Sequence, residues 1–126
     1  MSGARNLLRL TAVLEGVTGL ALITDPSLVA RLLLGDDVAG AGIALGRVAG
    51  FGLVSLACAC WPASEQAEVG PSRRAMRTYN ALIAVFLLYL GIRSERSGGL
   101  LWPAVVIHGV LTLLLGREAL SQARLR

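Results

Sequence analysis

Four long apolar runs take up most of this chain of 126 residues, and the connections between them are short. Hydrophobic residues make up 55% of the sequence and charged residues only 16%, which leaves too little polar surface to cover a water-soluble domain of this size. A helix needs roughly 20 mainly apolar residues to cross a bilayer. The sequence therefore predicts an all-α integral membrane four-helix bundle, a single membrane domain over residues 1–126, with spans at about 7–24, 39–61, 76–92 and 100–116.

The first run has a second interpretation, because Arg5 and Arg9 precede it as basic residues precede the apolar part of a signal peptide. However, Glu15 stands in the middle of the run, and no small-residue cleavage site follows it near Thr24. These two features favour a first membrane helix that is retained.

All 12 Lys/Arg positions are arginine, and their distribution predicts the orientation in the membrane. Eight lie in the two tails and in the connection between the second and third runs: Arg5, Arg9, Arg73, Arg74, Arg77, Arg117, Arg124 and Arg126. The opposite side has only Arg31, Arg93 and Arg96. By the positive-inside rule, we expect a multi-pass protein of the bacterial inner membrane with both termini in the cytoplasm. No basic stripe with interleaved aromatic residues predicts nucleic-acid binding.

The first outer connection contains a predicted amphipathic helix at about 26–34. Asp25 is a capping residue, Pro26 suits the first helical position, and Gly35 suits the end. Such a helix is too short to cross the bilayer. We expect it to lie along the outer membrane surface or to fold in as a lid over the bundle, and the pattern is equally typical of a plain connector.

A glycine stripe opens the second run, with Gly42, Gly46 and Gly50 spaced four apart on one helical face. Gly16 and Gly19 lie in the first run. Because glycine permits close approach of helix backbones in lipid, we expect these two runs to pack as an antiparallel hairpin. The alternative is that the stripe faces a second copy of the chain.

Three of the runs carry one ionisable residue in their middle: Glu15, Arg47 and His108. Each lies eight or nine residues from the outer end of its run, so the rise of about 1.5 Å per residue places all three near the midplane. Glu15 and Arg47 form the expected buried ion pair, and His108 is the best single proton carrier of the chain. Intramembrane charges are costly and commonly functional. A buried pair that only fixes which helices pack together is the competing interpretation.

A second polar layer is expected nearer the cytoplasmic side, where Asn80, Tyr79 and Thr112 lie about one turn inside their runs. Asn80 needs a hydrogen-bond partner in lipid, and Thr112 or Tyr79 can supply one. We predict these three residues and Arg47 as binding residues. Cys58 and Cys60 lie two residues apart and point to opposite helix faces, and no metal-binding spacing is present.

Short motifs in the chain resemble those of a family of small uncharacterised bacterial four-helix membrane proteins. They are Asp25-Pro26, Gly46-Arg47, Tyr79-Asn80 and Leu101-Trp102-Pro103 followed by His108. The resemblance covers nearly the full chain and brings no established activity. In helix number and size the chain is also similar to DoxX-like proteins, some of which are associated with quinone-linked oxidation. That likeness implies a quinone as a lipophilic redox partner and transfers no residue, while the residues themselves indicate no cofactor.

Three classes of function follow. The first is a small membrane protein that binds a lipophilic small molecule or acts as an accessory subunit of a larger membrane complex. The second is an integral membrane enzyme in which Glu15 and His108 are the acid and base and Arg47 holds an oxyanion. The third is a transporter that works as a homo-oligomer. We rank them in this order, because four short spans form a scant pathway and no broken-helix repeat is visible.

Overall fold

In the computed structural model the chain folds into five helices, and residues 2–64, 66, 68–93 and 97–123 are described. The helices are α1 (Ser2–Thr24), α2 (Pro26–Leu34), α3 (Ala41–Cys60), α4 (Gly70–Arg93) and α5 (Leu101–Ala123). The all-α prediction is confirmed. Three of the arginines used for the orientation, Arg96, Arg124 and Arg126, lie outside the described residues.

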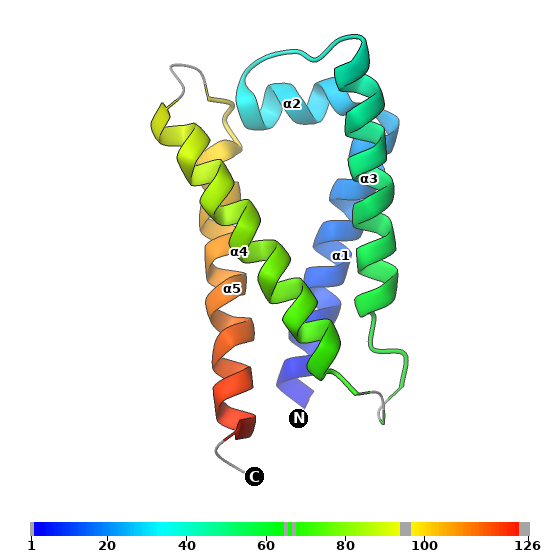
Figure 1. Ribbon diagram of the computed structural model, residues 1–126, viewed down its shortest axis with the longest axis vertical. Helices are drawn as coiled ribbons and strands as arrows, with labels where there is room; N and C mark the ends of the chain where they lie inside the picture. The colour runs from blue at the N-terminus through cyan, green and yellow to red at the C-terminus, as the bar shows by residue number, and fades with distance from the viewer. Residues whose placement is uncertain (1, 65, 67, 94–96, 124–126) are drawn as a thin grey trace.

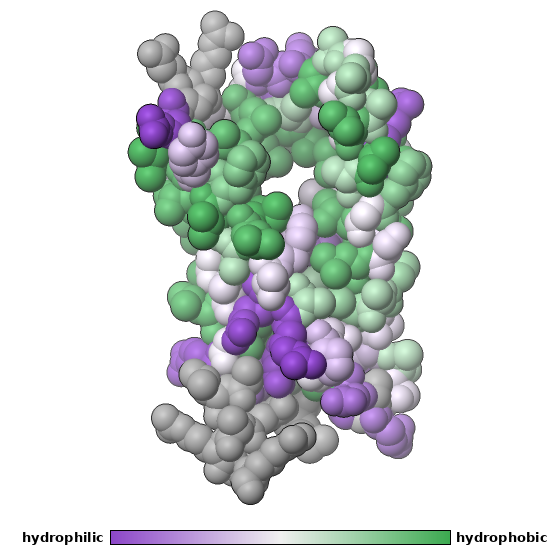
Figure 2. Space-filling view, in the orientation of Figure 1, coloured by the Kyte–Doolittle hydropathy of each residue, from purple (hydrophilic) through white to green (hydrophobic). Residues whose placement is uncertain are grey.

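Four of these helices, α1, α3, α4 and α5, are long and apolar enough to cross a membrane. Large apolar side chains are exposed along all four, for example Leu10, Leu45, Leu82 and Leu113. Figure 2 shows hydrophilic residues gathered toward the two ends of the molecule and hydrophobic residues along its sides. In water such a surface would be costly, whereas in lipid it is the expected exterior, so the chain is a multi-pass membrane protein.

The four long helices form two hairpins (Figure 1). α1 packs mainly against α3, and α4 packs mainly against α5. The start of α1 and the end of α5 lie at one end of the bundle, which we call the terminal end, and α2 crosses the opposite end, which we call the α2 end. The hairpins meet toward the terminal end and diverge toward the α2 end.

The main cluster of buried side chains is built from all four long helices. It comprises Leu8, Ala12, Ala57, Cys60, Met76 and Leu115, with Leu7, Leu56 and Val69 packed against it. These residues come from the first half of α1, the last part of α3, the first part of α4 and the last part of α5, which is the half of each helix nearer the terminal end. The hairpins are therefore held together mainly in that half.

Glycine contacts join α1 to α3, as the sequence predicted. A Cβ atom on Gly50 would lie 2.6 Å from the carbonyl oxygen of Gly19 and 2.8 Å from Cγ1 of Ile23. The two backbones are in direct contact, which only glycine allows at these positions. Gly46 is covered by Pro26 of α2. Gly46 and Gly50 of the stripe therefore pack against other helices of the same chain.

α2 has the predicted bounds and both predicted caps. The Asp25 side chain accepts a hydrogen bond from the backbone N–H of Leu28 at 2.9 Å. Gly35 ends the helix in the left-handed conformation, at φ 73°, and its N–H bonds to the Arg31 carbonyl. Polar groups at both helix ends are thereby satisfied within the segment.

α2 is fastened across the end of the bundle. The backbone N–H of Gly98 donates to the Leu33 carbonyl at 3.1 Å, and that of Leu100 donates to the Leu32 carbonyl at 2.8 Å. These bonds tie the end of α2 to the connection between α4 and α5. The fold places α2 across the end of the bundle as a lid, a position that also agrees with a helix along the membrane surface.

An opening lies beneath this lid. Figure 2 shows a gap that passes between the two hairpins, below α2 and between α3 and α4. α2 spans the distance between the hairpins at its level, and the buried cluster closes it at the terminal end. In a membrane, the opening would therefore face lipid at its sides.

Candidate functional site

Three helices bring four polar side chains together where the hairpins meet. Glu15 comes from α1, Tyr79 and Asn80 come from α4, and His108 comes from α5. Glu15 lies on the buried face of α1 together with Leu8, Thr11 and Ala12, and its side chain is 1% exposed. Asn80 is fully buried at 0%. We call these four residues the central polar cluster.

The contacts of Glu15 within the central polar cluster cross from the first hairpin to the second, and the other contacts join α4 to α5. Tyr79 interacts electrostatically with the Glu15 carboxylate. His108 Nδ1 lies 3.7 Å from Glu15 Oε1 and 2.7 Å from Asn80 Oδ1. The Tyr79 and His108 rings meet edge to face, with centroids 6.3 Å apart. Glu15 is thus the contribution of the first hairpin, and the other three side chains surround it from the second.

The hydrogen bonds of Asn80 determine which His108 nitrogen carries a proton. Asn80 Nδ2 donates to the Met76 carbonyl at 2.9 Å, and this bond fixes which end of the amide is oxygen. Asn80 Oδ1 is then only an acceptor, so the 2.7 Å contact requires a proton on His108 Nδ1. Asn80 therefore sets the tautomer of a neutral His108, as second partners of histidine commonly do.

One oxygen of Glu15 is left unsatisfied. Oε1 is buried and has no hydrogen-bond partner among the residues that the structure describes. The Nδ1 proton of His108 points to Asn80, and 3.7 Å is beyond hydrogen-bond length. A buried polar atom without a partner costs free energy, and in a native protein it commonly marks a site for water, a ligand or a proton. The central polar cluster can accept one further hydrogen bond.

Arg47 does not join the cluster, and the predicted buried ion pair with Glu15 is wrong. The Arg47 side chain is exposed, and Glu15 faces His108 instead. The reason is the position of Arg47 around the helix. Gly46 and Gly50 occupy the buried face of α3, and each residue advances about 100° around an α-helix, so the residue after Gly46 points away from that face. Glu15 and Arg47 lie at similar depths along their helices, but their side chains point in different directions.

The predicted second polar layer is also wrong. Asn80 lies ten residues after Gly70, the first residue of α4, or about 15 Å along the helix, which places it at mid-span with His108. The prediction began this helix at residue 76 and so put Asn80 and Tyr79 too near its end. Thr112 bonds the His108 carbonyl of its own helix at 2.8 Å and is not hydrogen-bonded to Asn80. The partner of Asn80, His108, is one that the sequence analysis did not pair with it.

The predicted candidates therefore divide into two groups. Glu15, His108, Asn80 and Tyr79 come together, whereas Arg47 and Thr112 do not take part. Within the described ranges, no three His, Cys, Asp or Glu side chains gather as they would around a metal ion. Comparison with protein-family models, with curated proteins and with solved structures finds no match to this chain.

Proposed function

We propose that this protein binds a lipophilic small molecule between its two hairpins, with the polar group of that molecule at the central polar cluster. The buried, unpartnered Oε1 atom of Glu15 is the observation that supports this proposal most directly. The opening beneath α2 gives it room, because it separates the hairpins on the side of the bundle opposite the buried cluster. Ligand sites of this kind are mostly apolar with a few convergent polar groups.

The chemistry of the cluster narrows the class of ligand. Oε1 of the buried Glu15 carboxylate is an acceptor that lacks a donor. The ligand should therefore carry a hydroxyl or N–H group on an apolar body. A quinol hydroxyl fits this acceptor, whereas the carbonyl of an oxidised quinone brings no proton to it.

Mass spectrometry of the purified protein tests the binding. The protein and two variants are extracted in mild detergent, and the small molecules that accompany them are identified. We expect the wild type and Thr18→Val to retain the same lipophilic donor, and Glu15→Leu to retain at least tenfold less. Thr18 is the matched control, since its hydroxyl bonds only the Leu14 carbonyl of its own helix. Recovery of bulk phospholipid alone from all three would contradict the proposal.

The membrane and its sidedness belong to the same proposal. The arginine asymmetry supports a bacterial inner membrane with the terminal end in the cytoplasm. Single cysteines at Gly3 and at Asp37, in a chain without Cys58 and Cys60, can be labelled in intact cells with an impermeant maleimide. We expect labelling at position 37 and none at position 3, and the reverse pattern would place the terminal end outside.

A second candidate, an accessory subunit of a membrane complex, is favoured by Arg47. This side chain lies six residues, or about 9 Å, inside α3 and is exposed where lipid would surround it. A charge at that depth is costly unless it meets a partner or reaches the headgroups. A photocrosslinker at position 47 should capture a second membrane protein, and one at the exposed Val17 should not.

Enzyme activity is the third candidate, and the geometry that favours it is the approach of two titratable groups. Glu15 Oε1 and His108 Nδ1 lie 3.7 Å apart, close enough for a bound substrate atom to contact both. Glu15→Gln keeps the size of the side chain and removes its proton exchange. If the bound molecule is a substrate, this variant should retain it unchanged, whereas the wild type should release product.

A further inference from the structure

A second pocket lies at the terminal end, between α1 and α5, far from the central polar cluster. It is open to the surface, has a volume of about 390 Å³ and is lined by Gly3, Leu7, Leu114, Arg117 and Glu118. That volume falls within the range of about 300–1,000 Å³ that is typical of small-molecule sites. Leu7 and Glu15 are eight residues apart on α1, or about 12 Å, so a molecule in this pocket need not touch Glu15.

The lining of the pocket is polar at one level and apolar at the next. Gly3, Arg117 and Glu118 lie nearer the helix ends, whereas Leu7 and Leu114 lie about one turn deeper toward the middle of the bundle. This order matches the boundary between headgroups and hydrocarbon in a bilayer. The headgroup of a membrane lipid in this pocket would contact polar residues, and its acyl chains would contact apolar residues.

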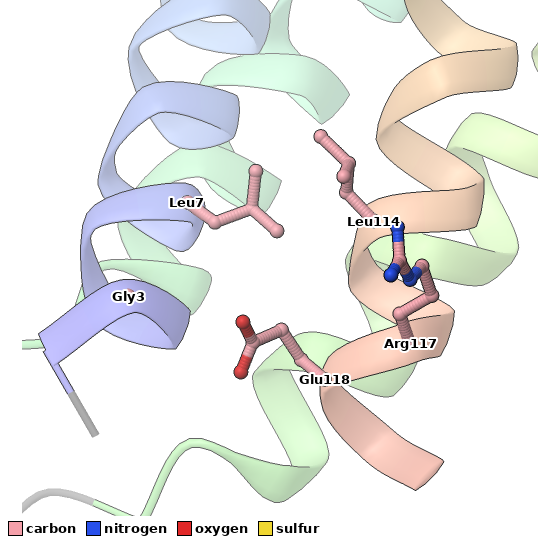
Figure 3. Close-up of a pocket in the computed structure, with 5 residues that line it drawn as sticks. All are labelled: Gly3, Leu7, Leu114, Arg117 and Glu118. Carbon is pink, nitrogen blue, oxygen red and sulfur yellow. The ribbon is translucent and has the colours of Figure 1, made fainter. Parts of the chain in front are cut away.

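The pocket holds one cation and one anion that are not directed at each other. Figure 3 shows the Glu118 carboxylate turned toward α1, while the Arg117 guanidinium points away from it. A Cβ atom on Gly3 would lie 3.6 Å from Glu118 Oε1, so the carboxylate lies close to the backbone of α1. Two separated opposite charges suit a ligand that carries both signs.

We propose that this pocket binds the headgroup of a phospholipid that carries a phosphate and a primary ammonium group, as in phosphatidylethanolamine. Arg117 binds the phosphate, for which the guanidinium fork is well suited. Glu118 accepts hydrogen bonds from the ammonium, and Leu7 and Leu114 contact the start of the acyl chains. A quaternary ammonium has no N–H to donate, and a headgroup with only a negative charge meets the Glu118 carboxylate with repulsion.

Native mass spectrometry with defined lipids tests the proposal. The full-length protein in detergent is titrated with phosphatidylethanolamine, phosphatidylcholine and phosphatidylglycerol of identical acyl chains. We expect the first to bind at least tenfold more tightly than the other two. Arg117→Met should weaken its binding at least tenfold, and Glu118→Gln should remove the preference over phosphatidylcholine. Arg74→Met, an exposed arginine on α4 that does not line the pocket, should change nothing.

Two further measurements separate the alternatives. Gly3→Leu fills the pocket and leaves both charges in place, so it should abolish the preference even if one of the charge variants folds poorly. Glycerophosphoethanolamine, which has the headgroup without acyl chains, should bind at least a hundredfold more weakly than the lipid. Equal binding of this soluble compound would reassign the site to a soluble phosphate. Equal affinities for the three lipids, or an unchanged preference in Arg117→Met and Gly3→Leu, would overturn the proposal.

Discussion

Asn80 is the residue on which the geometry of the central polar cluster depends. Its amide bridges the Met76 carbonyl at 2.9 Å and His108 Nδ1 at 2.7 Å, and it is fully buried. Replacing it with an apolar residue would leave a buried imidazole N–H without an acceptor. The energetic cost of such an orphan exceeds the modest net gain of the bond itself.

We therefore expect Asn80→Leu to lower the free energy of unfolding by about 1–3 kcal/mol. The matched control is Thr112→Val, which removes only a bond to the carbonyl of its own helix and should change stability by less than about 0.5 kcal/mol. Thermal unfolding in detergent measures both. Equal effects of the two variants would show that the contact of Asn80 with His108 stabilises the protein no more than the Thr112 hydrogen bond does.

The tautomer of His108 gives a second, independent prediction at the same scale. The chain has a single histidine, so imidazole ¹⁵N spectra contain one pair of signals. In the wild type the proton of the neutral ring should reside on Nδ1, held by Asn80, and in Asn80→Leu the spectrum should shift toward the Nε2 form. An Nε2–H spectrum in the wild type would contradict the assignment of the Asn80 amide.

At the scale of single residues, the sequence predicted how deep a side chain lies in the bundle better than it predicted the direction in which the side chain points. Counting residues from the helix ends correctly placed Glu15 and His108 at one level, because the rise of an α-helix is constant. The side on which Arg47 points was also available, since Gly46 and Gly50 were already assigned to the packed face. The pairing of Asn80 with His108 was not available, because it depends on where α4 begins and on how α4 packs against α5.

At the scale of the helices, close backbone contact governs the first hairpin. α1 and α3 touch where Gly19 meets Gly50. In lipid, packing of this kind replaces the hydrophobic effect as the force that associates helices. Substitution of a glycine that faces outward on the same helix should not change stability. α3 contains both packed and outward-facing glycines.

Gly50→Ala should destabilise the protein by about 1–3 kcal/mol, because the new methyl group would overlap the Gly19 carbonyl and Ile23. Gly52→Ala is the control, because nothing lies within 4 Å of a Cβ atom at that position. It should alter stability by no more than about 0.5 kcal/mol. Unfolding of both variants in the same detergent compares them, and a tolerant Gly50 would mean that the helices are farther apart than described.

The attachment of α2 provides the other prediction about helices. A Cβ atom at Gly98 would overlap the carbonyl group of Leu32, whereas one at Gly99 would meet nothing within 4 Å. We expect Gly98→Ala to break the bonds between α2 and the α4–α5 connection. Hydrogen exchange of the Leu100 amide should then accelerate at least tenfold, and Gly99→Ala should leave it unchanged. Unaltered exchange in Gly98→Ala would show that α2 is not fastened there.

At the scale of the whole molecule, the structure consists of two hairpins joined by a limited set of contacts. Each hairpin brings its own closely packed pair of helices, and the buried cluster, the central polar cluster and α2 connect them. The number of spans followed from the sequence, because the thickness of the bilayer determines how many apolar residues each span needs. The divergence of the hairpins did not, because it reflects where bulky and small side chains meet across helices that are distant in sequence.

Two separate chains, residues 1–66 and 67–126, should therefore insert and reassociate in the membrane, as independently stable helices do in the two-stage view. Glu15→Leu should weaken the association at least tenfold, or about 1.4 kcal/mol, because it removes the contacts with Tyr79 and His108. Val17→Leu, a change at an exposed position of the same helix, should not. Copurification of one half with a tag on the other measures the effect. Halves that never associate would show that the covalent connection is required.

The position of α2 determines how anything reaches the space between the hairpins. With α2 across one end and packed side chains at the other, we expect a ligand of the proposed site to enter laterally from the bilayer. The occupancy of that space then depends on how much of a compound dissolves in hydrocarbon, so its partition coefficient counts as much as its shape. A water-soluble analogue with a matching polar group would arrive too dilute to compete.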